Sequence, residues 1–263
     1  MHDLAFIFAG FFVGIVVGLT GIGGGSLMTP ILIFFFDVKP YLAVGTDLLF
    51  AAFTKMGGTV RLARARLVDW RVVFHLSAGS IPAALITLFV LSQVGAASAR
   101  VQGLMTTTLG VALLLTAAAT LYKALRGRAA PTTVVRGQEV LAATPRHWSL
   151  PLLFGAVIGT LVTLTSVGAG AIGVTVLMLL YPLLPLPRIV AADIAYAVPL
   201  TLVAGLGHAS LGSVDWPLLV KLLAGSLPGI WIGSHLISRI PERVIRSLLS
   251  VLLAYAGAKL ITL

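Results

Sequence analysis

The sequence has no cysteine and few charged residues, and very few of those are acidic. Without cysteine the chain has no disulfides, no thiolate metal ligands and no thiol nucleophile. Charged residues make up 10% of the 263 residues, whereas a typical soluble domain has about a quarter. Hydrophobic residues make up 59%, and the mean hydropathy is +1.08. This composition argues against a soluble globular protein.

Two long uncharged runs indicate an integral membrane protein. Residues 4–36 and 149–187 contain 33 and 39 consecutive residues without a formal charge. A helix crosses a bilayer with about 20 apolar residues, so each run exceeds one span. The 28 glycines and 13 prolines disfavour a transmembrane β-barrel, whose strands alternate apolar and polar positions. We therefore expect an all-α, multi-pass helix bundle in the cytoplasmic membrane, with the lipid bilayer as its surroundings.

Basic residues outnumber acidic residues by 18 to 8, which gives a net charge of +10. In a soluble protein this excess would suggest nucleic-acid binding. Here most basic residues lie between apolar runs, where Lys and Arg mark the cytoplasmic side of a membrane protein. We therefore expect no nucleic-acid partner. The sequence leaves open whether copies of the chain form a homo-oligomer.

Ten apolar segments fall into two groups of five. Residues 123–147 separate the groups and carry five basic residues and two prolines, as expected of a linker. We therefore divide the chain into a first repeat (1–122), a cytoplasmic linker (123–147) and a second repeat (148–263). The expected segments are residues 4–20, 26–36, 41–60, 72–92, 99–122, 149–164, 169–184, 188–206, 216–237 and 244–263.

The two groups are related in sequence. Residues 44–82 align with residues 190–228 at a constant offset of 146, with 12 identities in 39 positions. The identities include Asp47 with Asp193, and further matches lie toward the end of the aligned segment. The alignment predicts an internal duplication.

Loop charges predict that the two repeats are inverted. Residues 61–71 carry four arginines, whereas the equivalent residues 207–217 carry no Lys or Arg. Residues 239–246 carry three arginines, whereas the equivalent residues 93–98 are uncharged. Because cytoplasmic loops collect Lys and Arg, equivalent loops are expected on opposite sides of the membrane. Inverted repeats of this kind are found in many secondary transporters.

Short segments beside glycines predict broken or re-entrant helices. Residues 26–36 would form a helix only about 16 Å long, too short for a hydrocarbon core of about 30 Å. Non-helical backbone at membrane depth is tolerated where protein covers it or where it lines a wet cavity. We therefore expect the substrate site at these breaks.

The glycine-rich breaks supply the candidate binding residues. Glycine leaves the backbone open, and the N–H groups that begin the following helix attract an anion. Neighbouring hydroxyls add donors, although small residues also serve simply to let helices pack closely. The candidate substrate-binding residues are Thr20, Gly21, Gly23, Gly24, Gly25 and Ser26 in the first repeat and Thr165, Ser166, Gly168 and Gly170 in the second.

Three charged residues lie inside apolar segments. Asp47 and Asp193 occupy equivalent positions, where a carboxylate is costly unless it is paired, protonated or wetted. They either couple transport to protons or cations, or cap a broken helix. Lys55 either provides the countercharge for an anion or extends its stem toward the interface near Arg61. All three are therefore assigned a coupling or structural role.

Residue patterns typical of enzymes and metal sites are missing. The five histidines have no metal-ligand spacing, and no nucleophile-elbow motif is present. We therefore expect no metal, no cofactor and no enzymatic activity.

The chain resembles the TauE/SafE family of sulfite exporters and related anion permeases, of the 4-toluene sulfonate uptake permease type. The resemblance rests on the glycine-rich block Gly18 to Gly25, on Pro30, and on the run Ala43 to Asp47, and it covers almost the whole length. The second half departs from the pattern, with Ala169 in place of a central glycine. The resemblance implies a secondary transporter whose partner is a small anionic solute such as sulfite, a sulfonate or sulfoacetate.

Export is the expected direction, because one negative charge leaving a negative-inside cell gains ~2.3 kcal/mol per 100 mV. Two alternatives remain open at this point. One is a cation or proton-coupled metal permease that uses Asp47 and Asp193 as ligands. The other is a non-transporting membrane scaffold.

Overall fold

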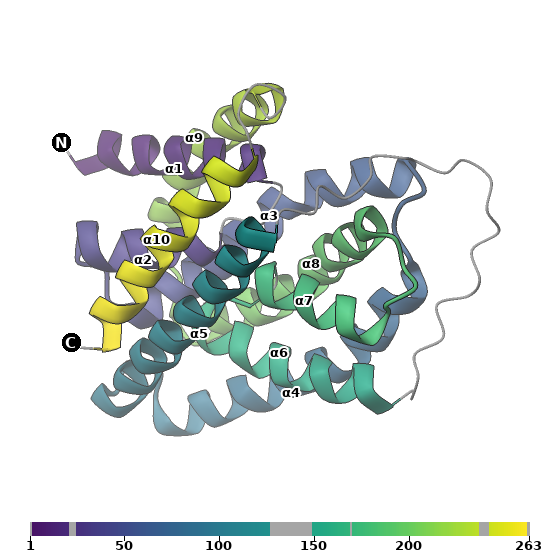
Figure 1. The fold of residues 1–263 in the computed structure, drawn as a ribbon. Coiled ribbons are helices and arrows are strands. Elements are labelled where there is room, and N and C mark those ends of the chain that lie inside the picture. The colour runs from purple at the N-terminus through teal and green to yellow at the C-terminus, as the bar shows by residue number, and fades with distance from the viewer. Residues whose placement is uncertain (1, 21–24, 127–148, 169, 237–241, 262–263) are drawn as a thin grey trace.

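The computed structural model describes residues 2–20, 25–126, 149–168, 170–236 and 242–261. Within these residues the chain forms ten helices and no strand (Figure 1). The predicted all-α fold is therefore confirmed. The helices are α1 (His2–Thr20), α2 (Gly25–Phe36), α3 (Pro40–Arg64), α4 (Trp70–Val94), α5 (Ala99–Arg126), α6 (Ser149–Thr165), α7 (Ala171–Leu180), α8 (Leu186–Ser210), α9 (Trp216–Leu236) and α10 (Glu242–Ile261).

The helix bounds repeat at the offset found in the sequence. Helices α3 and α8 begin and end 146 residues apart, and α2 and α7, like α4 and α9, begin 146 residues apart. Local signals explain the agreement. Asp69 accepts a hydrogen bond from the backbone N–H of Arg71 at 3.1 Å, and Asp215 accepts one from Leu218 at 3.0 Å. Each aspartate thus caps the N-terminus of an equivalent helix.

The basic loop at residues 61–71 is shorter than the sequence suggests. Helix α3 continues through Arg61 to Arg64, so only residues 65–69 connect it to α4. Basic side chains in the last turn of a helix complement the negative end of its dipole, which favours this extension.

The two halves exchange helices. Helix α1 packs along α9, and α6 packs along α4, whereas α3 packs on α8 and α5 on α10. In Figure 1 the α1–α9 pair lies at the upper left and the α4–α6 pair along the bottom. The first helix of each half therefore packs against the fourth helix of the other half.

Helices α3 and α8 run antiparallel. An added Cβ at Gly45 would lie 3.1 Å from the Cβ of His208. At the other end of the pair, the Thr59 hydroxyl lies 3.5 Å from the carbonyl oxygen of Ile194. As residue numbers rise along α3 they fall along α8, so these equivalent helices have opposite directions.

Glycines allow close approach of the exchanged helices. An added Cβ at Gly14 of α1 would lie 2.4 Å from the carbonyl oxygen of Ser226 in α9, and one at Gly159 of α6 would lie 2.4 Å from the carbonyl oxygen of Ser80 in α4. The small-residue packing considered for the glycine-rich breaks therefore operates at these helix crossings.

A break separates α6 from α7 in the second half. Ser166, Gly168 and Gly170 have φ values of 59°, 134° and 141°, which no regular right-handed helix contains. Helix α7 has 10 residues, or about 15 Å, too short to cross a bilayer by itself. The predicted broken helix is therefore confirmed here. The equivalent break at residues 21–24 lies outside the described residues.

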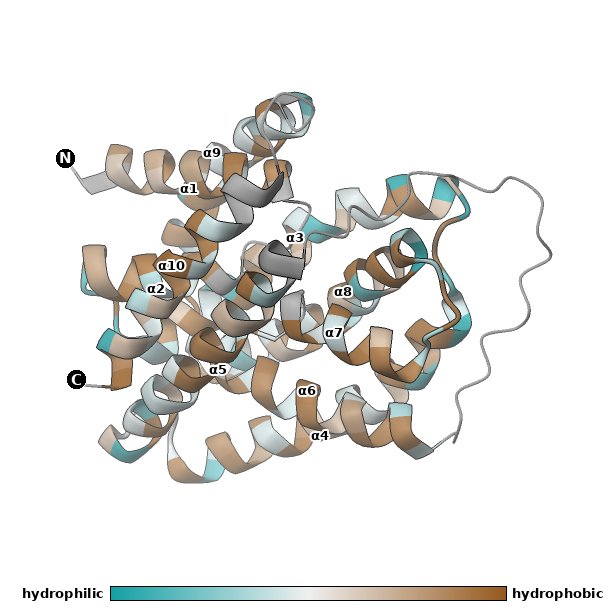
Figure 2. Cartoon of the chain, viewed as in Figure 1, coloured by the Kyte–Doolittle hydropathy of each residue, from teal (hydrophilic) through white to brown (hydrophobic). Residues whose placement is uncertain are grey.

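The helices suit a lipid environment. Among the described residues, four helices are long and apolar enough to cross a membrane: Trp70–Val94, Ala99–Tyr122, Leu186–Ser210 and Trp216–His235. Large apolar side chains such as Phe8, Phe35 and Leu183 are exposed, and Figure 2 shows brown, apolar residues along the helices. Such an exposed apolar surface marks a membrane-facing protein.

Candidate functional site

Asp47 is a fully buried carboxylate near the start of α3. The Thr29 hydroxyl of α2, also fully buried, donates a hydrogen bond to Oδ2 of Asp47. This bond ties the second turn of the short helix α2 to α3. A buried carboxylate needs such donors, because burial removes the water that would otherwise solvate it.

Ser166 lies in the break between α6 and α7 of the second half, close to Asp47 of the first half. Its hydroxyl lies near enough to interact with the Asp47 carboxyl, but it makes no hydrogen bond of normal geometry. Oδ1 of Asp47 also lacks a hydrogen-bond partner. Ser166 therefore links the break between α6 and α7 to the buried carboxyl of α3.

Asp193 lies in the second half, on α8, with 2% of its surface exposed. Gly173, in the first turn of α7, lies against its carboxylate, since an added Cβ there would be 2.0 Å from Oδ1. Asp47 and Asp193 therefore each contact the short helix of their own half.

Lys55 lies in the interior. Its side chain is 6% exposed, and its amine is close enough to interact electrostatically with Asp193 and Asp47. This burial favours a role for Lys55 inside the protein over the alternative in which it reaches toward the interface near Arg61. We call Asp47, Lys55 and Asp193 the charged centre.

Hydroxyl groups that the sequence interpretation missed surround the charged centre. Tyr196, three residues after Asp193, places its hydroxyl near that carboxylate and near Ser80 of α4. Ser80 is fully buried, and Thr29 has a threonine at the equivalent position, Thr175. For Thr29 and Ser80, the equivalent Thr175 and Ser226 at the 146-residue offset were a signal that could have identified them, whereas Tyr196 matches Phe50 and had no such signal.

The predicted residues of the second break shape its backbone. Thr165 donates to the carbonyl oxygen of Leu161 at 2.6 Å and accepts from the N–H of Val167 at 3.1 Å, so its hydroxyl closes the end of α6. The carbonyl oxygens of Gly168 and Gly170 accept hydrogen bonds, each at 2.9 Å, from the first turns of α7. Of the predicted residues in this break, Ser166 is the one that reaches the charged centre.

The predicted residues of the first break are described only in part. Thr20 ends α1, and Gly25 and Ser26 begin α2. Gly21, Gly23 and Gly24 lie outside the described residues. Their proposed contact with a substrate therefore stays a prediction.

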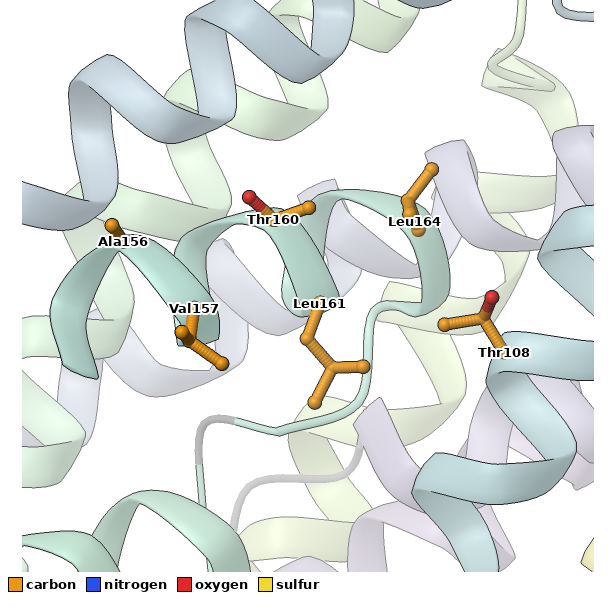
Figure 3. A pocket seen from close by; sticks show the side chains of 6 residues that line it. All are labelled: Thr108, Ala156, Val157, Thr160, Leu161 and Leu164. Carbon is orange, nitrogen blue, oxygen red and sulfur yellow. The ribbon is translucent and has the colours of Figure 1, made fainter. Parts of the chain in front are cut away.

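The charged centre is closed in this conformation. Asp47, Asp193 and Ser166 are each at most 5% exposed. A hollow of about 430 Å³ opens elsewhere, between α5 and α6 (Figure 3), and it is lined by Thr108, Ala156, Val157, Thr160, Leu161 and Leu164. The charged centre is therefore not open to solvent. Among the described residues, no group of three or more His, Asp or Glu side chains is placed to hold a metal ion.

Comparison with known proteins identifies the family. Residues 6–260 match the family described as sulfite exporter TauE/SafE. The probable membrane transporter protein YjnA of Bacillus subtilis (strain 168) is 35% identical over 259 residues, covering 98% of this chain and all of the relative. The probable membrane transporter protein YunE of the same organism is 27% identical over 275 residues, covering 99% of this chain and 98% of the relative. No solved structure matches the chain.

These relatives carry transporter names, in agreement with the prediction of a membrane transporter and not an enzyme. The resemblance inferred from the glycine-rich block is confirmed over nearly the full length. The chain belongs to the sulfite exporter TauE/SafE family and is a multi-pass membrane transporter.

Proposed function

We propose that the protein is a secondary transporter that exports small sulfur-containing anions, such as sulfite, sulfonates or sulfoacetate, across the cytoplasmic membrane. Family membership over residues 6–260 supports the class of substrate. The observation that carries the mechanism is the buried charged centre, where an amine, two carboxyls and the Ser166 hydroxyl meet at the break between α6 and α7.

The proposed mechanism uses residues 1–122 and 148–263 as inverted repeats, joined by a cytoplasmic linker at 123–147. Shared helix bounds and the antiparallel packing of α3 on α8 support this arrangement. Transport then consists of a rocking of the two halves about the substrate, as in other transporters with inverted repeats. Because each half holds the first helix of the other, each moving body combines helices from both repeats.

An anion would use the Lys55 amine, which lies near both carboxyls, as a donor. The two carboxyls together outweigh that single positive charge, so an anion also requires a carboxyl to be protonated. The Ser166 hydroxyl, near the Asp47 carboxyl, offers a donor at the helix break. The N–H groups that begin α7 add the positive end of a helix dipole beside Asp193. We place the substrate between the two glycine-rich breaks, next to the charged centre.

Flux measurements on the purified full-length protein in liposomes test this function. Labelled sulfite, sulfoacetate and methanesulfonate are offered under an outward anion gradient, with protein-free liposomes as the blank. We expect saturable flux and mutual competition for at least one of these anions. Ser166→Ala should raise KM, whereas Ser92→Ala, which changes an exposed serine of α4, should not. If none of the anions shows saturable flux under any gradient, the proposed function is wrong.

A further inference from the structure

His208, in the last turn of α8, is a fully buried histidine that contacts another helix. Its Nε2 atom lies 2.9 Å from the backbone carbonyl oxygen of Thr163, in the last turn of α6. The rings of His75 and His235 instead contact carbonyl oxygens of their own helices, four residues earlier, and lie at exposed positions. Among the histidines whose side chains the structure describes, His208 is therefore the one that joins two helices.

The end of α6 leaves the Thr163 carbonyl without its helical donor. In a continuing helix the N–H of Val167 would bond this oxygen. Here that N–H bonds the hydroxyl of Thr165 at 3.1 Å. A carbonyl oxygen left over at a helix C-terminus needs another donor. His208 supplies it from α8.

This contact assigns the proton on the His208 ring. A carbonyl oxygen only accepts hydrogen bonds, so Nε2 is the nitrogen that carries the proton. Nδ1 is buried and has no hydrogen-bond partner. A second proton there would leave a buried N–H group unpaired, which is costly. The imidazole is therefore a neutral donor that caps the C-terminus of α6.

The turn after α8 packs on α3 beside His208. An added Cβ at Gly45 of α3 would lie 2.0 Å from the carbonyl oxygen of Ser213 and 3.1 Å from Cβ of His208. The N–H of Asp215 donates to the hydroxyl of Thr46 at 3.0 Å. Thr46 and Ser213 are both fully buried. Helices α3 and α6 and the turn after α8 therefore meet at His208.

These contacts adjoin two residues of the candidate site. Thr46 directly precedes Asp47, and Thr163 lies three residues before Ser166. Asp47 is buried on α3, and Ser166 begins the break after α6 with a φ of 59°. Because Asp47 and Ser166 belong to different halves, their relative position depends on how α3 and α6 are held together. His208 contacts both of these helices.

The equivalent turn of the first half forms without these polar groups. At the 146-residue offset, His208 matches Leu62 and Ser213 matches Leu67. The N–H of Leu67 donates to the carbonyl oxygen of Leu62 at 3.1 Å, and the N–H of Ser213 donates to that of His208 at 2.9 Å. Two leucines thus build the same backbone turn, so the turn itself does not explain a buried histidine.

We infer that His208 is a positioning residue of the transporter, whose Nε2–H caps α6 from α8 and thereby fixes where the break between α6 and α7 begins. It acts through the backbone of α6 on Ser166. The inference rests on the proposed function, because Ser166 is a candidate substrate-binding residue. The role depends on the N–H donor and not on the bulk of the ring.

Two amide substitutions test the donor. His208→Gln places an amide N–H at about the reach of Nε2, whereas His208→Asn is one methylene shorter and does not reach Thr163. With methanesulfonate flux in liposomes as the assay, His208→Gln should keep KM within about threefold of wild type. His208→Asn should raise KM by about tenfold or more, because the break is misplaced. His75→Asn, at an exposed position of α4, is the matched control and should behave as wild type.

A single cysteine reports the position of the break without any transport. The chain has no cysteine, so Ser166→Cys introduces one thiol, at a position that is 5% exposed. A charged methanethiosulfonate reagent should label it slowly in detergent, both with His208 present and in His208→Gln. His208→Asn should raise the labelling rate by about tenfold or more, because the break is no longer held. Ser92→Cys, at an exposed position of α4, should label equally in all backgrounds.

Nitrogen-15 NMR of the wild-type histidine rings tests the bond itself and does not depend on how the variants fold. The His208 signal, assigned by its loss in His208→Gln, should be that of a neutral ring with its proton on Nε2. A proton on Nδ1 instead overturns the inference.

Equal effects of His208→Gln and His208→Asn, whether both behave as wild type or both are impaired, also overturn the inference. In that case saturable wild-type flux leaves the proposed function intact. If wild-type protein carries no sulfite or sulfonate, the proposed function fails, and labelling of residue 166 still decides whether His208 fixes the break.

Discussion

Replacing Gly173 by alanine tests whether the position of the Asp193 carboxylate controls transport. A Cβ at residue 173 would lie 2.0 Å from Oδ1 of Asp193 and 3.1 Å from its carboxyl carbon. Real Cβ atoms essentially never approach another heavy atom closer than 3.0 Å. The carboxylate must therefore move by about 1 Å, or α7 must shift by the same amount, a displacement typical of one added methyl group in a packed interior.

The expected loss follows from this displacement. Asp193 interacts with Lys55, so moving its carboxylate disturbs that interaction. A misplacement of about 1 Å in a functional site typically costs around a hundredfold in rate. We expect Gly173→Ala to lower the transport rate between tenfold and a hundredfold. Alanine favours a helix over glycine by about 1 kcal/mol, so the fold itself should survive.

Initial rates of methanesulfonate or sulfite flux in liposomes measure the effect, and thermal unfolding in detergent checks the fold. Gly103→Ala is the matched control, because it adds the same methyl group inside α5 with no atom within 4 Å. A folded Gly173→Ala protein with wild-type rate and KM would refute the role assigned to Asp193.

Three further substitutions test the packing and the caps. Gly14→Ala places a Cβ 2.4 Å from the carbonyl oxygen of Ser226 and should destabilise the α1–α9 crossing by about 1–3 kcal/mol, seen as a lower Tm in detergent. Thr29→Val removes the hydroxyl that donates to Asp47 and should cost about 1–3 kcal/mol and slow transport. Asp69→Ala removes the cap of α4 and should cost about 1 kcal/mol of stability with little effect on KM.

Each of these predictions has a conservative control. Gly57→Ala meets no atom within 4 Å and should keep the Tm, so an equal fall in both glycine variants would contradict the packing argument. Thr29→Ser restores the hydroxyl and should recover transport. Asp69→Asn keeps a capping side chain, and a loss as large as that of Asp69→Ala would show that capping is not the cause.

The helical architecture was readable from local sequence signals. Uncharged runs longer than one span predicted helices, and the shared offset of 146 residues predicted equivalent bounds, which α3 and α8 have. The break at residues 165–170 was also predictable, because glycines and the short segment after them fit no continuous span. Local signals sufficed because helix limits depend on nearby caps, prolines and glycines.

Contacts between distant segments were not readable in this way. The sequence marked Thr165 and Ser166 alike as donors, yet the hydroxyl of Thr165 bonds its own turn while that of Ser166 reaches Asp47. It also left the location of Lys55 open, and the structure buries that residue. Thr29 carried no local signal of its own, since an isolated threonine in an apolar helix is ordinary.

The sequence by itself determined an all-helical membrane protein with two related halves and aspartates at matching positions, because hydropathy and repetition are properties of the chain alone. The tertiary structure decided that α1 and α6 pack on the opposite halves and that one lysine lies beside both aspartates. The physical reason is that burial and pairing of a charge depend on which helices meet. These helix–helix contacts follow from the close packing of helices that are far apart in the chain.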